Sequence, residues 1–368
     1  MDAGLGRDLM ADAVSRIAGL LHLGAGRGFA RGSAGLYALL AALARDRGPG
    51  EVVVPAICCE SVALAAAYAG HAVRIAEISP ETLCLTPETL APHLSARTRA
   101  VLVVHVFGID ARCARFQPLR DAFPEAVFVE DIAHAVGGRD EAGRFLGGAL
   151  DYALLSFADD KILPGNGGML APGPHSRGPA LDALEGTVAA DAPPTPPRPL
   201  ALSLRNLVHG LADLWRERPQ SETAPAFMAI AGAYRDLIVC GGPIRDLPAL
   251  DRAAGRLEAI RSGRYARYLR YRNGIDSARA RVIDLHGGST CWRCPVLLQS
   301  PRQAREVTAT LRAKGIHASN HYFPLNLLFG GGRLPVAEEA AARIVNLWVD
   351  EATPESMVDA AIDTINHC

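Results

Sequence analysis

The sequence predicts an α/β protein, with a large domain whose mostly parallel sheet is flanked by helices and a smaller C-terminal α+β domain. The chain has 368 residues, too many for one ordinary core. Hydrophobic residues make up 49%, so a large core can be buried. Short continuous apolar runs alternate with helical segments, which is typical of a parallel sheet covered on both faces.

The alternating pattern runs from Gly32 to Gly168 and predicts the large domain. The expected strands are 51–55, 72–78, 98–106, 127–129 and 152–157, and the expected helices are 36–43, 61–68 and 116–123. Each expected strand is a short apolar run between turn-forming segments, so its length favours a strand over a helix. We therefore predict a large domain over residues 1–240.

Beyond this region the pattern changes, which predicts a second domain. Residues 172–199 are rich in proline, alanine and glycine and are expected to form a loop. The remaining expected elements are the helices 202–215, 250–273, 302–314 and 354–367 and a strand at 295–299. They suit a small domain over residues 241–368, on which an amphipathic N-terminal helix within 1–23 can pack.

Charge and hydropathy argue against several function classes. The formal net charge is −1, which gives no electrostatic reason to expect nucleic acid or an anionic membrane surface as a partner. No apolar run reaches the roughly 18 residues that a membrane span needs. The N-terminal segment also lacks the basic start and apolar middle of a signal peptide. We expect a cytoplasmic protein with no nucleic-acid or membrane partner.

The eight cysteines are a modest number for this length and are expected to be reduced thiols. Cys291 and Cys294 form a single C-x-x-C pair, which cannot complete a four-ligand zinc site. The apolar run 291–298 favours a strand, in which residues three apart face opposite sides. We favour a core role for the pair and predict no metal, while a redox or metal role stays open.

Two of the three segments that carry chemistry lie at expected helix and strand ends. Gly32-Ser33-Ala34-Gly35 begins an expected helix, where small residues let an anion approach free N–H groups. A plain helix cap would have the same composition. Asp131 follows an apolar strand, at the sheet edge where such folds bind ligands, and His134 comes three residues later. Asp131 could pair with a protonated pyridine nitrogen, although a capping Asp with a satisfied His is the structural alternative.

The third segment contains Ser156 and Lys161. Ser156 lies near the end of an expected strand, and Lys161 follows on a tight segment that leads to a glycine pair. A lone lysine is usually a solvated surface charge. Lys161, however, is followed by Ile162 and Leu163, close to the apolar sheet. A partly desolvated amine has a lowered pKa and can act as a nucleophile and a base.

In this order, the three segments resemble the pyridoxal-phosphate aminotransferases of the DegT/DnrJ/EryC1/StrS family, the sugar aminotransferase branch of the aspartate aminotransferase fold. The resemblance is strong over residues 30–170 and looser in the C-terminal part. Further similar segments are Val53-Val54-Pro55, Val103-Val104-His105-Val106-Phe107-Gly108, Gly315-Ile316 and His321-Tyr322-Phe323-Pro324-Leu325.

The resemblance implies the cofactor pyridoxal 5′-phosphate, held as a Schiff base on Lys161, which would also move protons. It implies that Asp131 keeps the pyridine nitrogen protonated and that His134 lies beside the ring. The implied cofactor-binding residues are Gly32, Ser33, Ala34, Cys59, Asp131, His134, Ser156 and Lys161, and the implied substrate residues are His321 and Tyr322. The implied activity moves an amino group from a small amino donor to the keto group of a biosynthetic intermediate, a keto sugar or related molecule, in a homodimer.

Four departures from the family pattern concern the substrate side. Cys59 stands where an aromatic residue usually stacks on the ring, and Asn166 replaces an acid in a loop that is one residue short. The segment before Gly32 is also short, and residues 219–234 lack a match to the family's neighbour-subunit segment. Two alternatives stay open: another pyridoxal-phosphate reaction on the same scaffold (elimination, decarboxylation or Cα substitution), and a degenerate cofactor-binding regulatory protein.

Overall fold

The computed structural model describes residues 3–184, 198–218, 223–320 and 322–368. Its largest sheet has seven strands in the order β1-β7-β6-β5-β4-β2-β3. These strands are β1 (Arg27–Phe29), β2 (Glu51–Pro55), β3 (Ala72–Ala76), β4 (Thr98–Val104), β5 (Val127–Asp131), β6 (Tyr152–Ser156) and β7 (Gly168–Pro172). Strands β3, β2, β4, β5 and β6 are parallel, whereas β7 and β1 add antiparallel pairs at one edge. The predicted mostly parallel sheet is confirmed, and the antiparallel edge is an addition that the apolar runs did not indicate.

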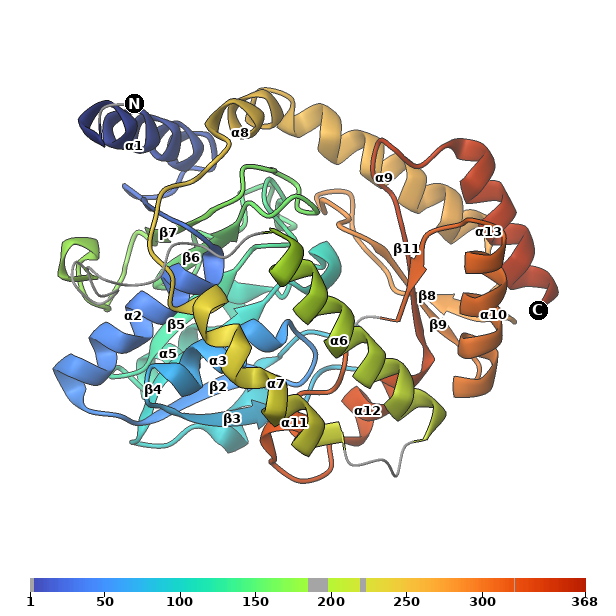
Figure 1. Cartoon of the computed structure of the whole chain (residues 1–368), viewed down its shortest axis with the longest axis horizontal. Helices are drawn as coiled ribbons and strands as arrows, with labels where there is room; N and C mark the ends of the chain where they lie inside the picture. The colour runs from blue at the N-terminus through green and yellow to red at the C-terminus, as the bar shows by residue number, and fades with distance from the viewer. Residues whose placement is uncertain (1–2, 185–197, 219–222, 321) are drawn as a thin grey trace.

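Helices flank this sheet (Figure 1). They are α2 (Gly32–Arg47), α3 (Glu60–Tyr68), α4 (Pro87–Leu90) and α5 (Gln117–Ala122), with short 3₁₀ turns η1 (Ala91–His93), η2 (Val106–Gly108), η3 (Cys113–Phe116) and η4 (Leu181–Leu184). In α2 the leucines at positions 36, 39, 40 and 43 are fully buried, because their spacing places them on one helix face. Every residue of β2 and β5 is buried, as expected for parallel strands covered on both faces.

Four helices connect the seven-stranded sheet to the rest of the chain: α6 (Arg198–Glu217), α7 (Thr223–Ile238), α8 (Leu247–Ala254) and α9 (Leu257–Gly274). Figure 1 shows α6 crossing the molecule between the two groups of strands. The single helix expected over 250–273 is wrong, because the chain breaks between α8 and α9. Gly255 ends α8, and Arg256 leaves the helical conformation with ψ of 11°.

The second sheet has four antiparallel strands in the order β10-β11-β9-β8. Its strands are β8 (Ala280–Val282), β9 (Cys294–Leu298), β10 (Ala318–Ser319) and β11 (Ile344–Leu347), and its helices are α10 (Pro301–Ala313), α11 (Asn326–Phe329), α12 (Pro335–Arg343) and α13 (Glu355–His367). A strand over the whole of 291–298 is wrong. It begins only at Cys294, because Cys291 has a left-handed φ of 50°, which no strand accommodates.

The N-terminal helix α1 (Ala3–Leu20) packs on β1 and on α8. Arg16 of α1 donates two hydrogen bonds of 2.8 Å to the Asp251 carboxylate of α8. This contact is compatible with the expected packing of the helix on the small domain, while the boundary near residue 240 stays a prediction. Among the described residues, no helix is both long and apolar enough to cross a membrane.

Candidate active site

A cavity of about 500 Å³ lies at the carboxyl ends of β4, β5 and β6. This is the sheet edge where open α/β folds bind ligands. Of the predicted site residues, those that line the cavity are Gly32, Ser33, Cys59, Asp131, His134, Ser156, Lys161 and Tyr322. Ala34 is buried in the first turn of α2 and does not line it. His321 lies outside the described residues.

Lys161 reaches this cavity from the tight segment after β6. The Lys161 amide donates to the Ala158 carbonyl (2.9 Å), which folds the segment back on itself. Ile162 and Leu163 are buried beneath it. Burial lowers the pKa of Lys161, and although the nearby Asp160 raises it, the net direction is downward. Lys161 is therefore an amine that loses its proton more readily than a surface lysine, as a nucleophile must.

Asp160 supplies a negative charge next to the Lys161 amine. Burial alone would raise the pKa of its carboxyl, but the charges of Lys161, Arg205 and Arg293 together lower it to about 2. Asp160 is thus ionised at neutral pH and lies directly beside the reactive amine in sequence. Its backbone carbonyl accepts the indole N–H of Trp292 (2.7 Å), which ties the lysine segment to the second sheet.

Glycines let three backbone segments meet at the start of α2. A Cβ on Gly168 would lie 2.1 Å from the Gly32 nitrogen, and one on Gly32 would lie 2.8 Å from the Leu155 carbonyl oxygen. No larger residue fits at either position without moving the backbone. The close approach places the free N–H groups of α2 beside the end of β6, where an anion can bind. The Ser33 hydroxyl donates to the Leu237 carbonyl at 3.5 Å.

Asp131 is the last residue of β5. Its Oδ1 accepts the Ala133 N–H (2.9 Å), while Oδ2 accepts no hydrogen bond from the described residues. Burial raises the pKa of this carboxyl. A cationic N–H group in the cavity that paired with Oδ2 would instead lower the pKa of Asp131. The helix-capping role considered for Asp131 is wrong, because no helix begins after β5: the bond from the Ala133 N–H closes a turn and leaves Oδ2 available for a ligand.

His134 lies at the centre of the polar cluster. Its Nε2 is 2.8 Å from Lys161 Nζ and 3.1 Å from the Tyr322 hydroxyl. Its ring stacks on Trp292 with centroids 3.8 Å apart and planes 4° apart. Lys161 Nζ also lies 4.4 Å from the centre of the Trp292 ring. Trp292 was missed in the sequence because it belongs to the second sheet's segment and only tertiary packing brings it here.

The opposite side of the cavity is formed by α6, and we call it the α6 wall: Arg205, His209 and Arg216. Arg205 lies 3.6 Å from an Asp160 carboxylate oxygen. Burial lowers the pKa of His209 to about 4, so this ring is neutral at physiological pH. Arg216 is buried and donates to the carbonyl oxygens of Asn320 and Tyr322, which fastens α6 to the segment before α11.

Arg31 adds a further cation at the start of α2, on the cavity lining. Its guanidinium makes no hydrogen bond or ion pair with a described residue, and burial lowers its pKa. A partly buried guanidinium without a carboxylate partner favours an anion as ligand. Its place beside the α2 N-terminus makes this part of the cavity the best place for a phosphate group.

Cys59 caps the start of α3 at the cavity edge. Its thiol lies 3.1 Å from the Ser61 hydroxyl. Burial and the neighbouring Glu60 raise its pKa to about 11, so the thiol stays protonated. Cys291 and Cys294, in contrast, are both fully buried. That burial agrees with the favoured core role.

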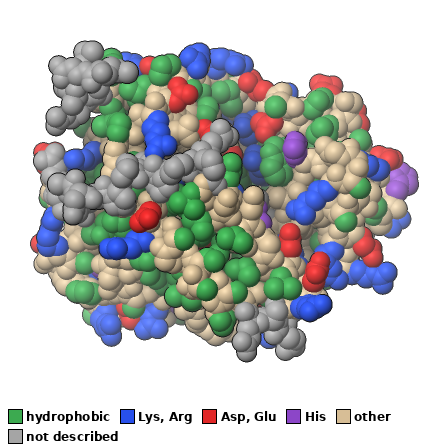
Figure 2. All heavy atoms as spheres, viewed as in Figure 1, with side chains coloured by type: hydrophobic (Ala, Val, Ile, Leu, Met, Phe, Trp, Pro, Cys, Tyr) green, Lys and Arg blue, Asp and Glu red, His purple; other side chains and the backbone are tan. Residues whose placement is uncertain are grey.

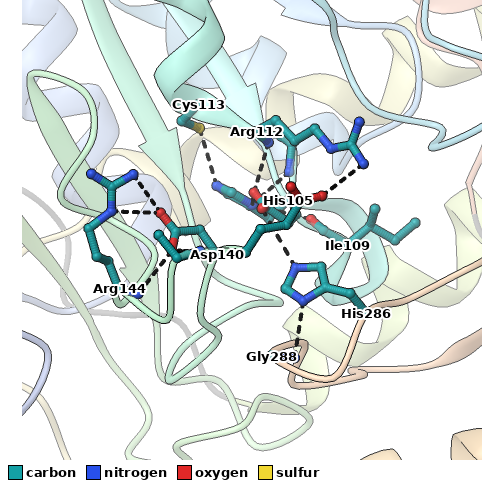
Figure 3. Close-up of polar contacts among 12 residues, drawn as sticks. His105, Ile109, Arg112, Cys113, Asp140, Arg144, His286 and Gly288 are labelled. Atoms are coloured by element: carbon teal, nitrogen blue, oxygen red, sulfur yellow. Dashed lines mark hydrogen bonds and ion pairs between the residues drawn. The ribbon is translucent and has the colours of Figure 1, made fainter.

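A second polar cluster, His105, Cys113 and Glu130, could geometrically ligate a metal ion, because their ligand atoms lie within 4.8 Å of one another. Cys113 Sγ is 3.4 Å from His105 Nε2 (Figure 3). The same Nε2 is 3.1 Å from Glu130 Oε1, and both Glu130 oxygens also accept backbone N–H groups. Burial lowers the pKa of His105, but Glu130 and Asp110 outweigh it and raise the pKa overall. The cluster is thus satisfied internally and stabilises the strand ends.

These features define a class of protein: a fold of the aspartate aminotransferase type with a half-buried lysine at the sheet's carboxyl edge. The fold is shared with the aminotransferase TlmJ from Streptoalloteichus hindustanus (TM-score 0.74, 23% identity, 98% of this chain and 90% of that chain). It is shared with Helicobacter pylori PseC, an aminotransferase of pseudaminic acid biosynthesis (TM-score 0.75, 15% identity, 97% and 90%). A third protein with this fold is S. venezuelae DesV, solved in complex with a ketimine intermediate (TM-score 0.73, 22% identity, 98% of this chain and 88% of that chain).

Within that class, residues 16–173, less than half of the chain, match the DegT/DnrJ/EryC1/StrS aminotransferase family, which is the family that the motifs resemble. A curated relative, UDP-N-acetyl-3-dehydro-alpha-D-glucosamine 3-aminotransferase of Acidithiobacillus ferrooxidans, is 31% identical over 168 residues. The matched stretch covers 45% of this chain and 43% of that relative, so it spans less than half of the relative's length. The family match over residues 16–173 contains Asp131, His134 and Lys161, whereas Trp292 and Tyr322 lie beyond it.

Proposed function

We propose that the protein is a pyridoxal-phosphate-dependent aminotransferase that transfers an amino group to the keto group of a small biosynthetic intermediate, a keto sugar or a related molecule. One observation carries the proposal. A lysine amine with a lowered pKa shares a cavity with a strand-end carboxylate, one oxygen of which accepts no hydrogen bond from the described residues. The family match and the sugar substrate of the curated relative support this reaction class.

The residues present fit the cofactor. Asp131 Oδ2, to which no described residue donates, suits a protonated pyridine nitrogen, and Arg31, whose guanidinium pairs with no described residue, suits a phosphate beside the α2 N-terminus. Ser33, Ala34 and Ser156 stay the predicted phosphate contacts, with Gly32 allowing the close approach. When bound, pyridoxal phosphate supplies an aldehyde that reacts with amines and a ring that withdraws electrons.

The chain's own residues have separable roles in this reaction. Lys161 would hold the cofactor through its amine, and the same amine would take and return a proton at the substrate's α-carbon. Asp131 stays ionised when it faces a cationic ring nitrogen, and so keeps that nitrogen protonated. His134 lies within hydrogen-bond reach of Lys161 and so holds the reactive segment against the ring.

The α6 wall is proposed to contact the acceptor. Arg205 is only half-buried and paired loosely with Asp160, so its guanidinium can turn to an anionic or hydroxyl-rich substrate. Tyr322 lies on the same side, and burial raises its pKa well above the ordinary value, so its hydroxyl remains a donor. Together they offer hydrogen bonds to a polar acceptor, such as a sugar.

We also propose a homodimer in the cytoplasm. Exposed large apolar side chains occur on α6 at Leu200, Leu202, Leu207 and Leu214 and on α7 at Met228. Figure 2 shows hydrophobic side chains gathered over the surface where Figure 1 draws these two helices. An apolar face of this kind supports burial against a second copy. Light scattering coupled to gel filtration tests the dimer, and a monomer at micromolar concentration would contradict it.

A half-reaction tests the proposed activity. Adding an amino donor such as glutamate to the cofactor-loaded enzyme should convert the lysine-bound absorbance band into that of the aminated cofactor. A keto acceptor should then restore the first band. If the cofactor binds but no donor gives the aminated form, an elimination, decarboxylation or substitution becomes the better assignment. If Lys161→Ala has no effect on function in the cell, a regulatory role would replace the enzymatic one.

A further inference from the structure

The segment before β9 contributes an unforeseen part of the site. Trp292 stacks on His134 at 3.8 Å, and its indole N–H donates to the Asp160 carbonyl at 2.7 Å. The Thr290 hydroxyl donates to the His134 carbonyl at 3.2 Å. Two consecutive parts of the large-sheet edge, the His134 loop and the lysine segment, are thus both held by one segment of the second sheet.

The backbone at Phe107 also contacts both His134 and Trp292, and its conformation is strained. Phe107 has a left-handed φ of 59°, which is costly for a bulky residue. In this conformation its N–H donates to His134 Nδ1 (3.3 Å), and its carbonyl accepts the backbone N–H of Trp292 (2.9 Å). Gly108 follows, and a Cβ there would lie 3.0 Å from the Trp292 nitrogen and the His134 carbonyl oxygen. The backbone of one residue therefore bonds both the His134 ring and the main chain of Trp292.

These contacts decide which nitrogen of His134 carries a proton. Nδ1 accepts a hydrogen bond from a backbone N–H, so it holds a lone pair and no proton. A neutral imidazole must then carry its proton on Nε2, the atom that faces Lys161 and Tyr322. A second proton on Nδ1 would break the bond from the Phe107 N–H, because a protonated ring nitrogen can only donate.

We propose that Trp292 is a positioning residue that, with the Phe107 peptide, locks His134 as the neutral Nε2–H tautomer aimed into the cavity. His134 is then a hydrogen-bond donor and not a proton-transfer base, which leaves that task to Lys161. The tautomer assignment follows from the contacts alone, and only its use toward the cofactor ring rests on the proposed function. The packing of the second sheet's segment on His134 therefore determines which ring nitrogen presents a proton to the cavity.

The test is ¹⁵N NMR of the histidine rings in the full-length, cofactor-free protein, with His134→Gln to assign the signal among the 11 histidines. In the wild type, Nδ1 should show the shift of an unprotonated nitrogen and Nε2 that of a protonated one, from pH 6 to pH 8. Trp292→Phe, which keeps an aromatic stack, should preserve this pattern. Trp292→Ala should give mixed tautomers or a doubly protonated ring at pH 6.

Two results would overturn the proposal: a protonated Nδ1 in the wild type, or an unchanged His134 signal in Trp292→Ala. If Trp292→Ala does not fold, Trp292→Leu replaces it, since leucine fills space without stacking, and the same pair of outcomes applies. No cofactor or substrate enters the measurement, so its result is independent of whether the aminotransferase assignment holds. A wild-type Nε2–H signal together with failed half-reactions would keep this inference and reject the activity.

Discussion

The two sides of the cavity are built in different ways. The side that carries Asp131, His134 and Lys161 consists of the ends of β5 and β6 and the loops directly after them. The α6 wall consists of a helix that follows a segment outside the described residues and is fastened by Arg216 to the chain before α11. Strand ends of a packed sheet fix side chains precisely in space, whereas α6 packs mainly on α7 and has no extensive contact with the sheet's strands.

This difference suggests that the reaction type and the substrate are encoded in separate parts of the molecule. The matched stretch 16–173 ends before α6 begins. Changes at the strand ends should therefore abolish chemistry, and changes on the α6 wall should alter substrate affinity.

The largest effect is expected from Lys161→Ala. Loss of the amine removes both the attachment point and the proton carrier, so kcat should fall by about 10²–10⁴-fold or more. The matched control is Lys314→Ala, because Lys314 is the chain's second lysine and bonds the Thr364 hydroxyl far from the strand ends. Steady-state kinetics with both variants would contradict the account if the two substitutions had similar effects.

The His105–Glu130 pair should dominate the stability of the strand ends. Glu130→Ala leaves His105 and two backbone N–H groups without their buried acceptor, which should lower the free energy of unfolding by about 3–5 kcal/mol. Urea denaturation followed by circular dichroism measures this. Glu125→Ala is the control, since Glu125 is an exposed surface residue. A loss of well under 1 kcal/mol would show that the His105–Glu130 pair contributes little to the stability of the fold.

Asp131 should give the cofactor-free protein a distinctive pH dependence. Because burial raises its folded pKa above the ordinary value of 3.8, the folded state binds more protons than the unfolded state in that interval. Stability should therefore fall as pH rises from about 3.8 through the raised pKa. Asp131→Asn should remove this fall and yet bind the cofactor more weakly. Thermal unfolding of both proteins across pH measures the fall in wild-type stability and its loss in the variant. A variant less stable than wild type at pH 7 would contradict the prediction.

A smaller, selective effect is expected on the α6 wall. Arg205→Gln should raise KM for the keto acceptor by roughly tenfold, the equivalent of one charged hydrogen bond. The half-reaction with the donor should keep its rate. Stability should change by less than about 1 kcal/mol, because the Arg205–Asp160 pair is partly solvated. A fall in kcat with unchanged KM would show that α6 takes part in the chemistry.

The smallest effect is expected at Cys59. With a pKa of about 11, roughly one thiol in 10⁴ is ionised at pH 7, so alkylation should be slow. Cys368 is exposed at the chain end and serves as the reference thiol. Mass spectrometry after brief iodoacetamide treatment should find Cys368 modified first. Faster labelling of Cys59 would indicate an activated thiol in the cavity.

The sequence predicted most of the large sheet and the three strand-end residues because each depends on local patterns. Apolar runs mark β2, β4, β5 and β6, and a polar residue after such a run lies at the ligand-binding edge. Trp292, Arg31 and Arg205 were not predicted as site residues, since their positions depend on packing between segments far apart in the chain. The break between α8 and α9 was missed because a single glycine in a helical pattern does not by itself end a helix.

Lys161 is proposed to carry the cofactor, and covalent trapping of the bound cofactor identifies the residue that does so. The purified protein would be loaded with pyridoxal phosphate, reduced with borohydride, digested and mapped by mass spectrometry. The chain has only two lysines, so the map has two internal candidates. We expect a reduced adduct on Lys161 and none on Lys314. An adduct on Lys314 alone, or no adduct despite cofactor binding, would contradict it.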